Sequence, residues 1–315
     1  MVKIAIAGGS GNIGQEIIDA LVAAKKHDIL ILTRKDIANG STVQGVTWTR
    51  TDYQDVNELA NILKGTHTVL SFITVHLDDG NQKRLIDAAV QAGVKRFAPS
   101  EWSSSSLDHM SWYGGKGEIR EYLRELNKDK KVLEYSLFQP GLLTNYLGHP
   151  HNTTKHVTML ETPIDFSNCR ILLAKGGEQS LITLTTIQDI ARIVCQAIEY
   201  EGEWPVIGGI SGSEVTLQQL IALGERIRGK RFRVDVLEVN DLKAEKVASS
   251  WMPGVRHPSI SEEEFAAMTA KLTSGLVLAF STGAWKVSDE WNSLLPDYKF
   301  TQVAEFLDDV WGNRS

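Results

Sequence analysis

The chain is poor in cysteine: it has two, Cys169 and Cys195, and neither lies in a Cys-x-x-Cys pair or another metal-ligand spacing. Two cysteines cannot build the disulfide framework of a small secreted domain, so a reducing compartment is expected. Long apolar runs are missing too. No stretch approaches the length of a membrane helix, and the N-terminal run is too short for a signal peptide. We therefore expect a cytoplasmic protein without a membrane segment.

Basic residues are not in excess either. The 33 lysines and arginines are outnumbered by 39 aspartates and glutamates, which gives a net charge of -6. Neither a basic stripe nor a block of like charges is present, so nucleic acid and anionic membranes are not expected as partners. The composition instead favours a small-molecule partner, and a homodimer stays open.

Short apolar runs alternate with helical patterns in the first half of the chain. The strand-like runs include "KIAIA", "DILILT" and "HTVLSFI", and the helices are expected to begin near Asn12, Val56, Asn81 and Lys116. This alternation is the sequence form of βαβ units, and nearly continuous apolar strands indicate a sheet covered on both faces. We predict an α/β fold: a doubly wound parallel sheet in residues 1–148 and a second, smaller α/β substrate domain mainly in residues 149–315. The helix predicted in residues 182–201 is expected to pack back on the first domain.

The segment "IAIAGGSGNIG" places glycines at a spacing of three between the first strand and the first helix. Bare backbone there allows a tight turn, and the free N–H groups of a helix N-terminus attract a pyrophosphate. The spacing differs from the common Gly-x-Gly-x-x-Gly pattern, and a purely structural turn is the alternative. Its position after a first strand favours a Rossmann dinucleotide-binding domain. The cofactor-binding residues predicted from this turn are Gly8, Ser10, Gly11, Asn12, Ile13 and Gly14.

The end of the second strand reads "ILTRKD" and bears on the choice of cofactor. An acidic residue at this point usually binds the ribose 2′-hydroxyl of NAD, whereas a cation suits the 2′-phosphate of NADP. Arg34 and Lys35 arrive before Asp36. We therefore predict NADPH, with Arg34 and Lys35 in contact with the phosphate, although Asp36 remains able to serve an NAD ribose.

The segment "SWYGGKGEIREYLREL" places a lysine on the apolar face of a predicted helix, because Lys116, Ile119 and Leu123 share one side. A lysine in such a position often snorkels from a helix end. The functional alternative is a partly desolvated ammonium that stabilises developing negative charge or relays a proton beside a nicotinamide.

With these segments, the chain resembles the NmrA-like and isoflavone reductase-like group of atypical short-chain dehydrogenases over nearly its full length. The resemblance rests on the glycine-rich turn, on "AGVKRFAPSEW" followed by an inward lysine, and on "FQPGLLTNYL", "ITLTTIQDIARIV" and "LLPDYKFTQVAEFLDDVWG". It implies an NADPH-binding Rossmann domain and a substrate cleft against a small C-terminal domain. It also implies that Lys116 is the active-site lysine, that Gly8, Gly11, Gly14 and Arg34 bind cofactor, and that Ser71 and Phe72 border it.

One departure concerns the Tyr-x-x-x-Lys pair of the wider dehydrogenase group. Trp112 occupies the position four residues before Lys116, and Tyr113 lies three residues before it. Residues three apart are also neighbours on a helix, so we predict Tyr113 as a second catalytic residue. The resemblance to isoflavone reductases, which manage without that tyrosine, leaves the proton donor open.

Other candidates are aromatic or histidine side chains. Trp102, Trp112, Phe138 and Tyr146 follow strand ends or neighbour Lys116, and we predict them to line an aromatic-binding cleft, with core packing as the alternative. His149, His151 and His156 lack a supporting acidic or cysteine pattern, so we predict a polar loop and no metal.

The sequence thus predicts an NADPH-dependent reductase that transfers hydride to a carbonyl or conjugated double bond of a small molecule. The substrate is expected to be hydrophobic and aromatic. The alternative from another class is a dinucleotide-sensing regulator that binds NADP without turnover and acts through a protein partner.

Overall fold

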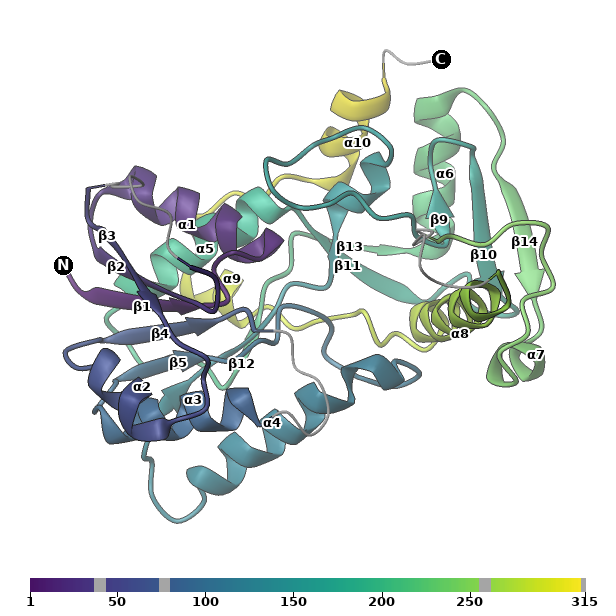
Figure 1. Cartoon of the computed structure of the whole chain (residues 1–315). Helices are drawn as coiled ribbons and strands as arrows, with labels where there is room; N and C mark the ends of the chain where they lie inside the picture. Colours follow the sequence, from purple (N-terminus) through teal and green to yellow (C-terminus); the bar gives the residue numbers. More distant parts are fainter. Residues whose placement is uncertain (37–43, 74–79, 255–261, 313–315) are drawn as a thin grey trace.

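A six-stranded parallel sheet forms the frame of the N-terminal half. The computed structural model describes residues 1–36, 44–73, 80–254 and 262–312, without the side chains of residues 262–265. The strand order is β3-β2-β1-β4-β5-β6, and every neighbouring pair is parallel (Figure 1). The strands are β1 (Lys3–Ala7), β2 (Asp28–Thr33), β3 (Val46–Arg50), β4 (Thr68–Ser71), β5 (Arg96–Ala98) and β6 (Glu134–Tyr135). The order reverses between β1 and β4, where ligands bind in open α/β sheets.

Helices cover both faces of this sheet, which confirms the predicted doubly wound arrangement. One face carries α1 (Asn12–Ala24) and α5 (Ile187–Glu199), and the other carries α2 (Val56–Ile62), α3 (Asn81–Gln91) and α4 (Gly114–Leu126). Alternate residues of β1 serve the two faces: Ile4 and Ile6 join the α1 and α5 core, and Ala5 and Ala7 join the opposite one. All four are fully buried, which explains why the strand reads as an unbroken apolar run.

A second group of elements lies beside the first and has a separate core (Figure 1). One small sheet pairs β11 (Leu181–Thr185) with β8 (Leu142–Leu143) and β13 (Ser213–Thr216), and another pairs β10 (Arg170–Ala174) with β9 (Ile164–Asp165) and β14 (Arg233–Leu237). The accompanying helices are α6 (Leu217–Arg228), α7 (Val239–Lys243), α8 (Glu262–Ser281) and α10 (Val303–Trp311). None of the described helices is long and apolar enough to cross a membrane.

The chain crosses between the two groups more than once. After β11 it returns to the first sheet as α5, which lies along α1. Strand β7 (Leu137–Gln139) pairs in parallel with β12 (Ile207–Gly209). Helix α9 (Glu290–Leu294) brings Trp291 into the same core as Ile4. The end of β4, the loop after β5 and the segment after β8 therefore meet near the first turn of α1.

Candidate active site

The glycine-rich turn leaves the N-terminus of α1 without a side-chain cap. Gly11 is the N-cap residue, and no side chain forms a capping hydrogen bond at this end of the helix. The first turn of α1 contains no acidic residue. Helices α2, α5 and α6, in contrast, are capped by Asp55, Thr186 and Thr216. The first N–H groups of α1 thus remain available for an anion, which the helix dipole attracts.

Two glycines let this turn approach the chain that leaves β4. Gly8 has a φ of +73°, and a Cβ there would lie 2.8 Å from the carbonyl carbon of Phe72. A Cβ on Gly14 would lie 3.3 Å from the Phe72 ring and 3.2 Å from the Gly8 oxygen. Side chains at these positions would force the turn away from β4. Gly11 differs, because a Cβ there would meet only the Gly8 oxygen, at 3.3 Å.

A cavity of about 460 Å³ opens at this turn, within the size range of small-molecule sites. It brings together three parts of the chain: the start of α1, the segments after β4 and β5 with the start of α4, and a segment that follows η2 (Thr144–Gly148). The lining residues are Gly11, Asn12, Ile13, Gly14, Phe72, Ser100, Trp102, Tyr113, Lys116, Tyr146, Val157, Thr158 and Leu160.

A stack of aromatic rings forms one wall of the cavity. Phe72 and Trp102 are stacked with centroids 4.6 Å apart, and Trp102 has a left-handed backbone with φ of +37°. Its indole Nε1 donates a 2.8 Å hydrogen bond to the carbonyl of Ser71. The stack continues into the core through Phe138, at 5.2 Å, and Trp291, at 5.4 Å. Such packing fixes the wall that a flat ligand would meet.

Phe138, predicted to line the cleft, is instead a core residue. It is fully buried, and Trp102 stands between it and the cavity. An aromatic residue after a strand looks the same in the sequence whether its side chain faces a ligand or the core, and strand β7 points this one inward.

Lys116 is anchored on the cavity by two backbone carbonyls. Its Nζ donates 2.7 Å hydrogen bonds to the oxygens of Ser100 and Glu101, which follow β5. An ammonium has three donors, so one N–H remains for a ligand within the described part of the chain. The same Nζ lies 5.0 Å from the centre of the Tyr113 ring. The structure therefore brings the two predicted catalytic residues together in one cavity.

Burial sets the protonation behaviour of this pair. It lowers the pKa of Lys116 to about 8, against an opposing effect of the Glu101 carboxylate, and Arg120 lowers that pKa further. Glu101 is itself buried and pairs with Arg120, whose Nε lies 3.0 Å from Glu101 Oε1. Burial also raises the pKa of Tyr113, which keeps the phenol protonated at neutral pH. Lys116 is thus a cation that can lose its proton near physiological pH.

The charges predicted to select the cofactor lie beyond the carboxyl end of β2. Arg34 and Lys35 are exposed there and outside the lining of the cavity. Asp36 is also exposed, and its carboxylate lies 3.4 Å from Nε of Arg50 at the end of β3. No sequence pattern groups Arg50 with these residues, because it is the last residue of a different strand, and the parallel pairing of β2 with β3 places it beside Thr33.

Two serines predicted to bind cofactor do not line the cavity. The Ser71 side chain is fully buried and donates to Oε1 of Gln82 on α3. Its hydroxyl is turned away from the cavity, so only the neighbouring Phe72 borders it. Ser10 is exposed on the turn, where its carbonyl accepts a 2.9 Å hydrogen bond from Gln15 Nε2.

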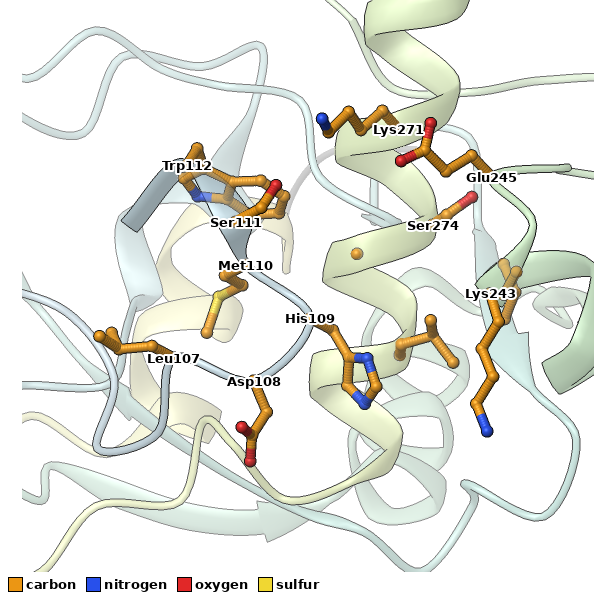
Figure 2. A pocket seen from close by; sticks show the side chains of 13 residues that line it. Leu107, Asp108, His109, Met110, Ser111, Trp112, Lys243, Glu245, Lys271 and Ser274 are labelled. Atoms are coloured by element: carbon orange, nitrogen blue, oxygen red, sulfur yellow. The ribbon is translucent and has the colours of Figure 1, made fainter. Parts of the chain in front are cut away.

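Trp112, predicted to bind substrate, lines a second cavity of about 430 Å³. This cavity lies between residues 107–112 and helices α7 and α8. Figure 2 shows Trp112 facing α8, from which Lys271 and Ser274 project. A Cβ on Gly275 would lie 2.8 Å from the Trp112 ring, so helix and ring are in direct contact. Tyr113 turns to the glycine-turn cavity instead, because η1 (Ser111–Tyr113) directs successive side chains to different sides.

The third wall of the glycine-turn cavity has no recognisable signature in the sequence. Val157, Thr158 and Leu160 belong to an irregular segment that carries no recognisable motif. His156 in this segment lies 3.2 Å from Asp19 Oδ2, and His151 contacts the ring of Trp311. No cluster of three or more metal-ligand side chains occurs in the described ranges.

Comparison with known proteins places the chain in a family. The model of the NmrA-like family matches residues 2–307, so the chain belongs to that family, as predicted from its sequence. Oxidoreductase BOA1 of Botryotinia fuckeliana is 29% identical over 240 aligned residues. The alignment covers 74% of this chain and 78% of BOA1. Phenylcoumaran benzylic ether reductase 1 of Arabidopsis thaliana is 35% identical over 135 residues, 38% of this chain and 43% of its own. The solved structure of AtPrR2 with NADP+ and (+)pinoresinol shares the fold, with a TM-score of 0.70, 18% identity and 98% coverage of both chains.

Gly11, where a Cβ would meet only the Gly8 oxygen at 3.3 Å, provides a direct test of the predicted phosphate site. Its backbone has φ of -81° and ψ of 160°, which any residue adopts, so Gly11→Val should fold with a melting temperature close to that of the parent. The added methyl groups would occupy the mouth of the cavity, and NADPH affinity should fall by about tenfold or more. Fluorescence titration with NADPH measures this. Normal affinity in the folded variant would show that the phosphates bind elsewhere.

Proposed function

We propose that the protein is an NADPH-dependent oxidoreductase of the isoflavone reductase type. It transfers hydride to a carbonyl or conjugated double bond of a hydrophobic, aromatic small molecule. The observation that carries this proposal is a single cavity that joins an uncapped helix N-terminus to a half-buried lysine whose ammonium is bound by two backbone carbonyls. The names of relatives in the family support the same class, since BOA1 is called an oxidoreductase.

The described residues fit NADP(H). The N–H groups at the start of α1 suit a diphosphate, and the missing side chain of Gly11 leaves it room. Arg34 and Lys35 offer exposed cations for a 2′-phosphate, while Asp36 is already next to Arg50. Cationic side chains form strong charge-assisted hydrogen bonds with phosphate, which supports NADPH over NADH.

The chemistry assigned to the chain concerns charge and protons. Bound NADPH supplies a hydride, which carries two electrons to an electrophilic carbon of the substrate. Negative charge then develops on the substrate oxygen, where the remaining N–H of Lys116 can donate a hydrogen bond or the proton itself. The Tyr113 phenol is the alternative donor within the same cavity. No covalent bond forms between the protein and the substrate in this reaction.

The wall of the cavity supports an aromatic substrate. Phe72 and Trp102 present flat surfaces that the rings behind them hold in place, and Tyr113 and Tyr146 add two more aromatic side chains. A planar substrate can stack on such a wall while its polar group points to Lys116. AtPrR2 was solved with the aromatic molecule pinoresinol, in keeping with this class of ligand.

A dinucleotide sensor without turnover is the alternative function. Holding an ammonium largely out of water costs free energy, which a protein that only binds NADP has no evident reason to spend. The burial of Lys116 therefore favours the enzyme. A broad panel of aromatic ketones and enones that gives no NADPH oxidation, together with NADP-dependent capture of a protein partner, would favour the sensor.

Arg34 provides the test of cofactor choice. The parent protein should bind NADPH well ahead of NADH, and Arg34→Ala should remove most of this preference, since a hydrogen bond to a charged group contributes about 1.5–3 kcal/mol. Arg124→Ala is the matched control, because Arg124 is an exposed arginine of α4 paired with Glu121. Calorimetric titration with both cofactors gives the ratio. Equal affinities in the parent would contradict the assignment.

Lys116 provides the test of catalysis. Lys116→Ala should lower kcat by about 100-fold or more, because an acid-base group acts mainly in the transition state. NADPH affinity should change far less, since the phosphates are assigned to other residues. Steady-state NADPH oxidation and a parallel binding titration separate the two effects. Unchanged turnover in Lys116→Ala would leave the enzyme class standing and remove Lys116 from the chemistry.

The lowered pKa of Lys116 predicts a pH profile. The ammonium is the active form, so kcat/KM for ketone reduction should be level in mildly acidic and neutral solution and should fall as pH rises through about 8. Tyr113 does not contribute this limb, because burial raises its pKa. The residual activity of Lys116→Ala should lack the decline. A parent profile that stays flat beyond pH 9, about one unit above that pKa, would contradict the role of the charged lysine.

A further inference from the structure

A buried carboxylate on α1 fastens the irregular segment that forms the third wall of the cavity. Glu16 is only 9% exposed, and its Oε1 accepts hydrogen bonds from the backbone N–H groups of Lys155, at 2.8 Å, and His156, at 2.7 Å. Burying a carboxylate is costly unless such donors satisfy it. Two charge-assisted bonds to backbone hold the main chain itself, whichever side chains the segment carries.

Glu16 is one of three polar residues along a single stripe of α1. Asn12, Glu16 and Asp19 follow the spacing i, i+4, i+7, which keeps them on one face of the helix. Asn12 Nδ2 donates a 3.0 Å hydrogen bond to Thr158 Oγ1, and Asp19 Oδ2 lies 3.1 Å from Lys155 Nζ. The segment 155–158 is therefore attached to the helix along its first two turns.

This attachment joins two walls of the cavity. Asn12 lies in the first turn of α1 and Thr158 in the opposite wall, and both line the cavity. Val157 is buried between the two points of attachment, while Leu160 continues the wall. A diphosphate on the N–H groups of α1 would thus lie directly beside the Asn12–Thr158 bridge.

We infer that Glu16 is a positioning residue that holds residues 155–160 as a clamp over the diphosphate of NADP(H) and slows release of the cofactor. The inference rests on the proposed function, because it takes a dinucleotide as the ligand. Glu16 itself touches neither the reacting atoms nor the open cavity, so its effect is expected in cofactor dissociation rather than in hydride transfer.

The clamp is tested by amide hydrogen exchange in the cofactor-free protein and by the rate of NADPH dissociation from the complex. In the cofactor-free protein, Glu16→Ala should speed hydrogen exchange at the amides of Lys155 and His156 by about tenfold or more, because both lose a charged acceptor. Stopped-flow displacement should show NADPH dissociating faster by a similar factor. Hydride transfer in a single turnover at saturating NADPH should stay within about twofold of the parent. Glu16→Gln keeps an acceptor oxygen and should restore most of the slow release.

Two further variants keep the test decisive. Asp19→Asn is the matched control: it weakens only contacts to partly exposed side chains, and dissociation should change by no more than about threefold. Thr158→Val removes the Asn12–Thr158 hydrogen bond without altering α1, and it should also speed the release of NADPH. This variant can test the clamp even if Glu16→Ala does not fold. Faster amide exchange with unchanged NADPH release would overturn the clamp and leave the proposed function intact. A parent protein that binds no NADPH would overturn both.

Discussion

The contact between the glycine-rich turn and the chain leaving β4 is the constraint on which the rest of the site depends. Gly8, in a left-handed conformation, lets the turn pass within van der Waals contact of the Phe72 backbone. Because of that approach, α1 begins directly above the sheet with uncapped N–H groups, and the Phe72 ring stands beside them. The proposed phosphate site and the aromatic wall therefore both lie at this one backbone contact, where the strand order reverses.

Lys116 completes the site from the other side of the sheet. The two carbonyls that bind its ammonium belong to Ser100 and Glu101 in the loop after β5, and the buried carboxylate of Glu101 pairs with the half-buried Arg120 of α4. Two neutral carbonyls bind this ammonium, burial lowers its pKa to about 8, and the Glu101 carboxylate opposes that lowering, so the group is partly desolvated and can stabilise a developing anion. The proximity of Tyr113 gives the cavity a neutral donor as well. The aromatic wall and this charged corner thus provide apolar and polar contacts within one cavity.

The sequence predicted the parts of the site that depend on local pattern. The turn after β1, the inward lysine and the parallel sheet each follow from spacing within a few residues. The sequence did not reveal which side of a short element a residue faces: the Ser71 hydroxyl donates to Gln82, and the Phe138 ring packs in the core. A shift of one position reverses the direction of a strand residue, so no composition argument resolves such cases.

The third wall of the cavity could not have been predicted from pattern at all. Thr158 joins Asn12 across 146 positions of sequence, and Glu16 reaches backbone N–H groups that every residue except proline possesses. An acidic residue in the second turn of a helix reads as an ordinary solvated charge. Only the fold shows that Glu16 is buried under a returning segment, and the same holds for Arg50, which parallel pairing places beside Asp36.

A crystal structure of the protein with NADP+ would show whether the cofactor occupies the cavity at the glycine-rich turn. We expect the diphosphate on the backbone N–H groups at the start of α1, the 2′-phosphate at Arg34, and the nicotinamide in the cavity between Phe72 and Lys116. Residues 155–160 should remain attached to Glu16 above the diphosphate. A nicotinamide bound away from Lys116, or phosphates bound away from the glycine-rich turn, would contradict the account.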